Sequence, residues 1–378
     1  MYTLELGPIR PPSEAQSILL RLTRNCPWNK CEFCHSYKNC SFSIRPIEEI
    51  KNDIDTIKLV SDHIDEIVSD SLHFSIQNIQ KIITRLTDIY AVPYTIAEYV
   101  SYWKLNGLKH VFLQDADSLV MKYPTILEIL KYLNQQIHTV ERITTYARSK
   151  TISKFSTEEV ATLKEYGLTR IHIGIESGSN EVLNVIQKGV TSDEHIKAGK
   201  SIKQAGIELS VYYIPGAGGK ELLSENALQS ANVMNQINPD FIRIRSIVPL
   251  PDTHLYTKHL QNKWILPGEI DKVKDLKIFI ENLNNIHSYI ASDHIVNLFS
   301  EINGKLPSDK KDLLSILDSF LKAPLKTQES FIVAKRFGLA DTFNDFTETK
   351  ETESIVNQLK VQFTSIDEAI LQILWKYI

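Results

Sequence analysis

Three of the four cysteines of this chain lie close together in one short segment. They are Cys26, Cys31 and Cys34, in the sequence Cys26-Pro-Trp-Asn-Lys-Cys31-Glu-Phe-Cys34. Thiolates bind soft metals and iron-sulfur clusters, and clustered cysteines in a chain that has few others are more typical of such a site than of disulfides. A strand-like run, Ser17 to Thr23, precedes them and offers a rigid support. The segment therefore predicts a metal or iron-sulfur site.

The fourth cysteine, Cys40, follows shortly after this group. Four thiolates on one ion or cluster would form a closed site, as in a ferredoxin or a structural zinc site. Three thiolates would leave one coordination position open for a ligand. We favour the open site because polar residues at the ends of later strands would otherwise lack a purpose, and the closed site stays as the alternative.

Short β-branched runs alternate with longer amphipathic runs along most of the chain, a pattern typical of βα units that build a parallel sheet. Helices are expected between the strands, for example over Thr157 to Tyr166 and Asp193 to Ala205. The expected strands are Ile18 to Thr23, Lys109 to Leu113, Arg142 to Arg148, Arg170 to Ile175, Glu208 to Ile214 and Phe241 to Val248.

The chain divides by pattern into a core and an extension. Residues 1–261 hold the expected strands, with a helical insertion around residues 55–108. Beyond residue 262 the strand signal disappears and helical periodicity dominates, so residues 262–378 are predicted to form a helical C-terminal extension. We expect the apolar positions of this extension to pack against the core or within the extension itself, and the extension to influence the choice of substrate.

Polar residues gather where the expected strands end, at the edge where α/β proteins place their sites. In the run Arg170 to Ser179, Ile171, Ile173 and Ile175 share one parity, so His172, Gly174 and Glu176 share the other. A carboxylate is therefore expected to point inward beside a glycine-containing turn. A solvated glutamate at an ordinary strand end is the simpler interpretation of that motif taken alone.

Three further strand ends carry polar side chains. Thr144, Tyr146 and Arg148 share one face at the end of the third strand, and Asp115 and Asp117 follow the second strand. These aspartates are candidates for binding and equally for helix N-caps. Arg243 and Arg245 share a face of the last strand and are suited to an anion or to a neighbouring acidic residue.

The charge balance narrows the class of substrate. The chain has 378 residues, with 42 Lys and Arg against 46 Asp and Glu, for a net charge of -4. This balance does not provide the basic surface expected of a protein that grips phosphate backbones, so nucleic acid is a disfavoured partner. The N-terminus lacks a signal-peptide pattern, and no uncharged stretch approaches the roughly 20 residues of a membrane span. We expect a cytoplasmic protein without a membrane span.

Taken together, these motifs resemble the radical SAM superfamily. The resemblance covers roughly residues 15 to 256 and rests on the succession of the three cysteines, the Asp115-Ala-Asp117 rim, Gly174-Ile-Glu-Ser-Gly-Ser179 and the Pro215-Gly-Ala-Gly-Gly219 turn. One departure is the spacing of the cysteines, where four residues rather than three separate Cys26 from Cys31. The resemblance implies an α/β fold, a partial (βα)6 TIM-like barrel with the helical extension appended.

The resemblance also implies cofactors and their ligands. Cys26, Cys31 and Cys34 would ligate a 4Fe-4S cluster whose open iron chelates S-adenosylmethionine, and Phe33 would pack near the adenine. Further contacts to S-adenosylmethionine are implied for Asp115, Asp117, Tyr146, Arg148, Glu176, Ser177 and Ser179.

The activity that the resemblance implies is that of a radical SAM enzyme. One-electron reduction of the cluster, by a donor such as flavodoxin or ferredoxin, would cleave S-adenosylmethionine to a 5'-deoxyadenosyl radical that abstracts hydrogen from a small organic or lipid-like substrate. The catalytic residues and the reaction subclass stay open. The alternative from another class is a non-catalytic iron-sulfur or zinc protein that uses all four cysteines.

Overall fold

The main sheet is an open series of strands. In the computed structural model, which describes residues 2–71 and 73–377, eight strands are hydrogen-bonded in the order β1-β4-β5-β6-β7-β8-β9-β10. Their bounds are β1 Ile18–Arg21, β4 His110–Gln114, β5 Arg142–Ala147, β6 Leu168–Glu176, β7 Glu208–Tyr213, β8 Phe241–Ile244, β9 Tyr289–Ala291 and β10 Gly304–Lys305. The order runs from β1 to β10 without closing, as in a partial TIM-like barrel, so the predicted fold class is confirmed.

The register of the strands brings their carboxyl ends to one edge. β1 pairs with β4, β4 with β5, β7 with β8 and β8 with β9, all in parallel, whereas β10 runs antiparallel to β9. Leu19 lies opposite Phe112, and Phe112 lies opposite Thr144. Because parallel strands end at the same edge, the loops after them start side by side.

All six predicted strands are present, with shifted ends. β1 ends at Arg21, and the two residues Thr23–Arg24 form a separate strand, β2, which pairs with β3 (Ser43–Ile44). β8 ends at Ile244 rather than at Val248, shortly before two prolines that cannot donate to a sheet ladder. The strands β9 and β10 lie beyond residue 262, where the pattern predicts helices alone. They are too short to produce a period-two signal.

Helices connect the strands and form most of the C-terminal part. None of the described helices is long and apolar enough to span a membrane. The α-helices are α1 Ile47–Ser71, α2 Ile79–Tyr90, α3 Tyr94–Leu105, α4 Tyr123–Gln136, α5 Ser149–Ile152, α6 Thr157–Glu165, α7 Asn180–Val185, α8 Ser192–Gln204, α9 Leu223–Ile237, α10 His254–Leu260, α11 Glu269–Glu281, α12 Lys310–Lys322, α13 Leu325–Arg336, α14 Lys350–Gln362 and α15 Ile366–Leu374. The 3-10 helices are η1 Pro12–Glu14, η2 Ser118–Val120 and η3 Trp375–Tyr377.

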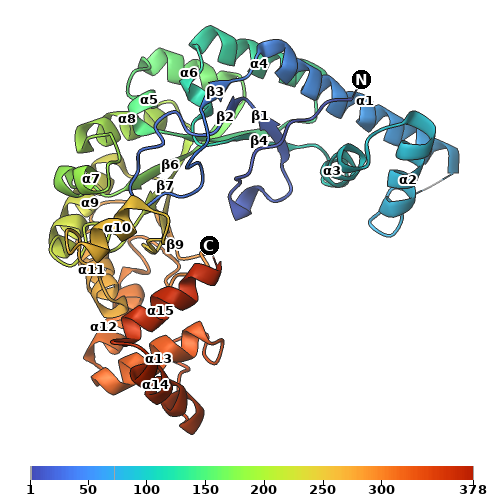
Figure 1. Ribbon diagram of the computed structural model, residues 1–378. Coiled ribbons are helices and arrows are strands. Elements are labelled where there is room, and N and C mark those ends of the chain that lie inside the picture. The colour runs from blue at the N-terminus through green and yellow to red at the C-terminus, as the bar shows by residue number, and fades with distance from the viewer. Residues whose placement is uncertain (1, 72, 378) are drawn as a thin grey trace. The chain divides into compact units, whose positions relative to one another are not determined.

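The described chain forms two compact units. The first unit comprises residues 2–27, 39–172 and 201–208, and the second comprises residues 28–38, 173–200 and 209–377. In the first unit α1 packs against α2, α3 and α4. In the second unit α11 packs against α9 and α12, and α13, α14 and α15 pack together (Figure 1). The division of the chain at residue 262 stays a prediction.

Candidate functional site

The cysteine segment crosses from one unit to the other. Cys26 belongs to the first unit, whereas Cys31 and Cys34 belong to the second. These three cysteines are half-buried and Cys40 is exposed. Cys34 closes a tight turn by donating its backbone N–H to the carbonyl of Cys31 at 3.3 Å. Among the described residues, no three His, Cys, Asp or Glu side chains already converge on a single metal position.

Backbone hydrogen bonds hold the turn that carries Cys31 and Cys34. The N–H of Glu32 donates to the carbonyl of Ile186 at 2.9 Å, and the carbonyl of Glu32 accepts from the N–H of Leu255 at 3.0 Å. Lys258 reinforces this arrangement, since its Nζ lies 3.3 Å from Oε1 of Glu32 and 3.0 Å from the carbonyl of Val185. The turn is therefore fixed between the loop after α7 and the start of α10.

A tryptophan side chain anchors the residues before this turn. Trp28 donates its indole N–H to the carbonyl of Gln187 at 2.7 Å. Its ring lies against Gly189, where an added Cβ would come within 2.2 Å of Cζ2. The loop after α7 therefore holds this part of the cysteine segment in place through its contacts with Trp28.

A pocket opens beside Cys34 in the second unit. Its volume is about 350 Å³, and its walls include Phe33, Cys34, Glu176, Tyr212, Arg245 and His294. Ile214, Val248 and Val296 add apolar wall. The structure therefore brings together three of the predicted site residues, Phe33, Cys34 and Glu176, from two distant segments of the chain.

Glu176 ends β6 in an uncommon backbone conformation. Its φ is +64°, in the left-handed region, and its Oε1 accepts a hydrogen bond from Nζ of Lys188 at 2.7 Å. Gly174 makes room for this ion pair, because a Cβ at that position would lie 2.1 Å from Oε1 of Glu176 and 2.9 Å from Nζ of Lys188. Residues forced into such conformations gather at functional sites. Gly174 therefore leaves the space that the Glu176–Lys188 ion pair occupies, and a role of Glu176 in cofactor binding stays a prediction.

Ser177 and Ser179 are almost fully buried and have structural partners. The hydroxyl of Ser179 caps α7 by accepting from the N–H of Val182 at 3.4 Å, and it donates to Oε1 of Glu225 at 3.0 Å. Oγ of Ser177 accepts from the N–H of Ser179 at 3.1 Å. These bonds shape the turn after β6, and the contact of either serine with a cofactor stays a prediction.

In the first unit, Asp115 supports the residues that lead into Cys26. Its φ is +71°, its side chain is fully buried, and its Oδ2 accepts from Nε of Arg21 at 2.6 Å. The same oxygen accepts from the N–H of Asn25 at 3.3 Å. Asp115 therefore ties the end of β4 to the residue immediately before Cys26.

Asp117 has spare hydrogen-bonding capacity in a buried position. Its Oδ2 accepts from the hydroxyl of Thr151 at 2.5 Å, whereas its Oδ1 has no hydrogen-bond partner among the described residues. Burial raises the pKa of Asp117 to about 6, although Thr151 and the charge of Arg148 lower it in part. Arg148 occupies the N-cap position of α5.

Tyr146 lies on the same face of the sheet as two other rings. Its ring centroid is 5.3 Å from that of Phe112 and 5.5 Å from that of His172. Oγ1 of Thr144, on the same parity of β5, is buried without a hydrogen-bond partner among the described residues. Thr144 and Tyr146 therefore both lie beside Phe112 of β4, whereas Arg148, predicted on the same face, lies beyond the end of β5.

The residues present fit a cluster and an amino-acid-containing cofactor. Three thiols in one segment are the donor set that a cluster with an open iron needs. A buried polar atom without a partner costs free energy, and Oδ1 of Asp117 and Oγ1 of Thr144 are two such atoms in the first unit. A ligand that carries hydrogen-bond donors would satisfy Oδ1 of Asp117.

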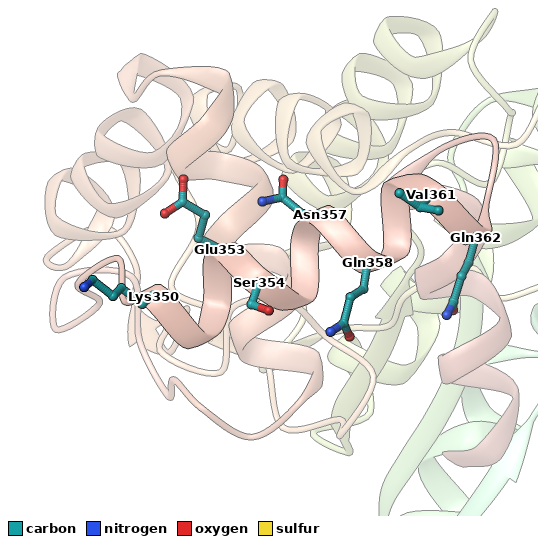
Figure 2. Close-up of a pocket in the computed structure, with 7 residues that line it drawn as sticks. All are labelled: Lys350, Glu353, Ser354, Asn357, Gln358, Val361 and Gln362. Atoms are coloured by element: carbon teal, nitrogen blue, oxygen red, sulfur yellow. The ribbon is translucent and has the colours of Figure 1, made fainter.

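Two other hollows suit the chemistry less well. One has a volume of about 520 Å³ and is lined by α14 alone. Figure 2 shows its lining residues, Lys350, Glu353, Ser354, Asn357, Gln358, Val361 and Gln362. Another, of about 580 Å³, lies in the first unit between the N-terminal segment and α3, with Tyr99, Tyr102 and Trp103 in its wall. No cysteine lines either hollow.

Several residues of the pocket beside Cys34 have no sequence signal of their own. His294 and Tyr377 enter from the C-terminal part of the chain, and Lys188 joins through Glu176. The seven-residue spacing of His287 and His294 is a weak metal signal that does not point to this pocket, because His287 is not among its lining residues. Only the packing of the C-terminal segment onto the strands shows where His294 and Tyr377 lie.

Comparison with known proteins gives a family match and distant relatives. Residues 83–222 match the model of the radical SAM superfamily. The chain is 26% identical to a tRNA uridine(34) acetyltransferase of Methanocaldococcus infernus over 102 residues, which are 27% of this chain and 19% of that protein. It is 26% identical to an uncharacterized methyltransferase of Pyrococcus horikoshii over 179 residues, 46% of this chain and 38% of that protein. The chain thus spans well under half the length of these relatives.

Two solved structures with a similar arrangement are a cobalamin-dependent S-adenosylmethionine radical enzyme and a methylornithine synthase. The cobalamin-dependent S-adenosylmethionine radical enzyme OxsB matches with a TM-score of 0.48 and 15% identity, over 97% of this chain and 55% of that chain. Methylornithine synthase matches with a TM-score of 0.42 and 14% identity, over 92% and 81%.

The matched family fixes the class of cofactor. Its members are enzymes that use a 4Fe-4S cluster and S-adenosylmethionine. The match spans α2 to the turn at Pro215 to Gly219 and so includes Asp115, Asp117 and the end of β6. Residues 83–222 of this chain therefore belong to the radical SAM superfamily.

Proposed function

We propose that Cys26, Cys31 and Cys34 ligate a 4Fe-4S cluster with one open iron, and that the enzyme acts on a small organic or lipid-like substrate in the pocket beside Cys34. The observation that carries this proposal is the shared pocket of Phe33, Cys34 and Glu176. A cysteine that is both half-buried and open to a cavity can place a cluster next to bound molecules. Cys40, which is exposed, is not among the residues that line this pocket.

When bound, a reduced cluster of this kind cleaves S-adenosylmethionine to methionine and a 5'-deoxyadenosyl radical, with the electron supplied by a donor such as flavodoxin or ferredoxin. The residues of the chain bind and orient the cofactor and the substrate and shield them from water. Glu176 offers carboxylate oxygens to hydroxyl or ammonium donors, and one of these oxygens also accepts a hydrogen bond from Nζ of Lys188. Ile214, Val248 and Val296 exclude water from the pocket.

The remaining predicted residues complete the cofactor contacts in this proposal. Asp117 has an oxygen available for a donor, and Arg148 suits a carboxylate because its planar guanidinium donates two parallel hydrogen bonds. Asp115 acts through Asn25 by holding the backbone before Cys26. Tyr146, Ser177 and Ser179 are proposed to shape the surrounding wall.

The reactions named for the relatives do not transfer directly. The tRNA uridine(34) acetyltransferase match covers 19% of that protein, and the methyltransferase match covers 38%. A net charge of -4 also disfavours a polyanionic substrate such as tRNA. A small substrate is therefore the better proposal.

Anaerobic reconstitution with iron and sulfide tests the proposal. We expect EPR of the reduced protein to show a 4Fe-4S signal that changes when S-adenosylmethionine is added, together with formation of 5'-deoxyadenosine. Cys34→Ala should lose the cluster, and the matched variant Cys40→Ala should keep both the cluster and its response. A cluster that ignores S-adenosylmethionine, or that disappears in Cys40→Ala, would support the closed four-cysteine site instead.

A further inference from the structure

The carboxyl ends of β7, β8 and β9 present polar side chains on one face. Tyr212 lies opposite Arg243, and Arg243 lies opposite Ala291. Arg245 comes directly after the end of β8, and its guanidinium lies over the ring of Tyr212 on that same face. Asp293 follows Ala291 by two residues and contacts both arginines. The face therefore holds two arginines and one aspartate.

Arg245 is held rigidly but uses only part of its hydrogen-bonding capacity. Its guanidinium lies over the ring of Tyr212, 4.8 Å from the centroid. Its Nη1 donates to Oδ1 of Asp293 at 2.8 Å and to the carbonyl of Ile244 at 2.9 Å. Nε and Nη2 donate to no described residue. These two groups form one planar edge that matches the two oxygens of a carboxylate or phosphate.

The charges around Arg245 leave one positive charge in excess. Arg243 also pairs with Asp293 and donates from Nε to Oγ of Ser210 at 3.1 Å, so one carboxylate serves two guanidinium groups. Burial raises the pKa of Asp293, but the hydrogen bond and charge of Arg245 and the charge of Arg243 together lower it by more. The net pKa is below the usual value of 3.8, so Asp293 is ionised at neutral pH.

The other ionisable groups of this pocket do not cancel that excess. The charge of Glu176 is balanced by Lys188, whose Nζ lies 2.7 Å away. Burial and the charge of Arg245 both lower the pKa of His294, so its ring is neutral at pH 7. The side chain of Arg245 is only 17% exposed, which strengthens its attraction for an anion compared with a surface arginine.

We infer that Arg245 is the receptor for an anionic group, a carboxylate or a phosphate, on the substrate of this enzyme. The inference rests on the proposed function, since it assumes that the pocket beside Cys34 receives the substrate. Tyr212 supports the guanidinium from below, and Asp293 holds its far side. Arg245 lines the same pocket as Cys34, so an anionic group bound to Arg245 would lie near the proposed cluster ligand.

The test uses inorganic phosphate as the probe, titrated by calorimetry into the reconstituted protein. Arg245→Gln should weaken phosphate binding at least tenfold, because a charge-assisted bidentate contact is lost. Arg245→Lys keeps the charge but lacks the planar edge, so its affinity for phosphate should lie between those of the wild type and Arg245→Gln. Arg10→Gln removes one exposed positive charge elsewhere and should bind phosphate as the wild type does.

A second arm separates the substrate from the carboxylate of S-adenosylmethionine. Phosphate should still bind when the protein is saturated with S-adenosylhomocysteine, whose amino-acid end occupies the cofactor position. Loss of phosphate binding under that condition would overturn the inference, and so would a wild type that binds no phosphate or an Arg245→Gln variant that binds it normally. Failure of the proposed function would be seen separately, as absence of 5'-deoxyadenosine.

Discussion

Replacement of Gly189 by alanine should loosen the cysteine segment. Gly189 has φ +68°, and an added Cβ would lie 2.2 Å from Cζ2, 2.4 Å from Cε2 and 2.6 Å from Cη2 of Trp28. These are atoms of a rigid ring, so the indole must move as a whole. Its hydrogen bond to the carbonyl of Gln187, 2.7 Å long, would be broken or stretched by that movement.

Gly206→Ala is the matched control. Gly206 has φ +69°, and no heavy atom lies within 4 Å of the position of its Cβ. Both variants carry the cost of a left-handed alanine, about 1 kcal/mol. Gly189→Ala adds the cost of displacing a packed ring, about 1–3 kcal/mol, together with the loss of a hydrogen bond worth about 1 kcal/mol. Trp28 is only half-buried, so the lower part of this range applies, and a difference of about 2 kcal/mol is expected.

Urea unfolding followed by circular dichroism measures the difference between the two variants. The iron content after reconstitution provides a second readout, because Trp28 lies between Cys26 and Cys31. Gly189→Ala should bind less iron than Gly206→Ala at the same protein concentration. Equal free energies of unfolding and equal iron contents would refute the argument that the loop after α7 positions the cysteine segment.

Two buried carboxyl groups should make stability depend on pH in separate ranges. Burial raises the pKa of Asp275 from 3.8 to about 7, although hydrogen bonds from partners such as Tyr213 lower it in part, so the folded protein holds a proton that the unfolded chain releases. The free energy of unfolding should therefore fall by about 4 kcal/mol as pH rises from about 4 to about 7. Asp275→Asn should remove this pH dependence, as measured by urea unfolding at several pH values. If the variant keeps the pH dependence, another group causes it. For Glu269, burial raises the pKa but Lys272 and Arg336 more than offset it, which leaves a value of about 2 against 4.5 when unfolded. Glu269 should therefore stabilise the folded protein by about 3 kcal/mol above pH 4.5, and this contribution should be lost as pH falls towards 2. Glu269→Gln should abolish this acid sensitivity and should destabilise the protein at pH 7, because Arg336 loses its partner. A variant as stable as the wild type at pH 7 would contradict the pairing.

Local patterns predicted the strands well because each strand is a short run with its own periodicity. The parity of Ile171, Ile173 and Ile175 placed Gly174 and Glu176 together on one face. In the structure the ion pair of Glu176 and Lys188 lies directly over Gly174. The strands β9 and β10 escaped prediction because three or two residues carry no period. Lys188 itself has no sequence signal, since its role follows from the path of the loop after α7.

The sequence by itself determined which reactive groups are available: three thiols at close spacing, a carboxylate at the end of β6, and two arginines at and just after the end of β8. Residue type and strand alternation are local properties, so they can be read without a fold. Only the tertiary structure decided which of these groups share a pocket. It placed Cys34, Glu176 and Arg245 in the wall of one pocket, together with His294 and Tyr377. Contacts between residues far apart in the chain depend on how helices and strands pack, so local sequence patterns do not reveal them.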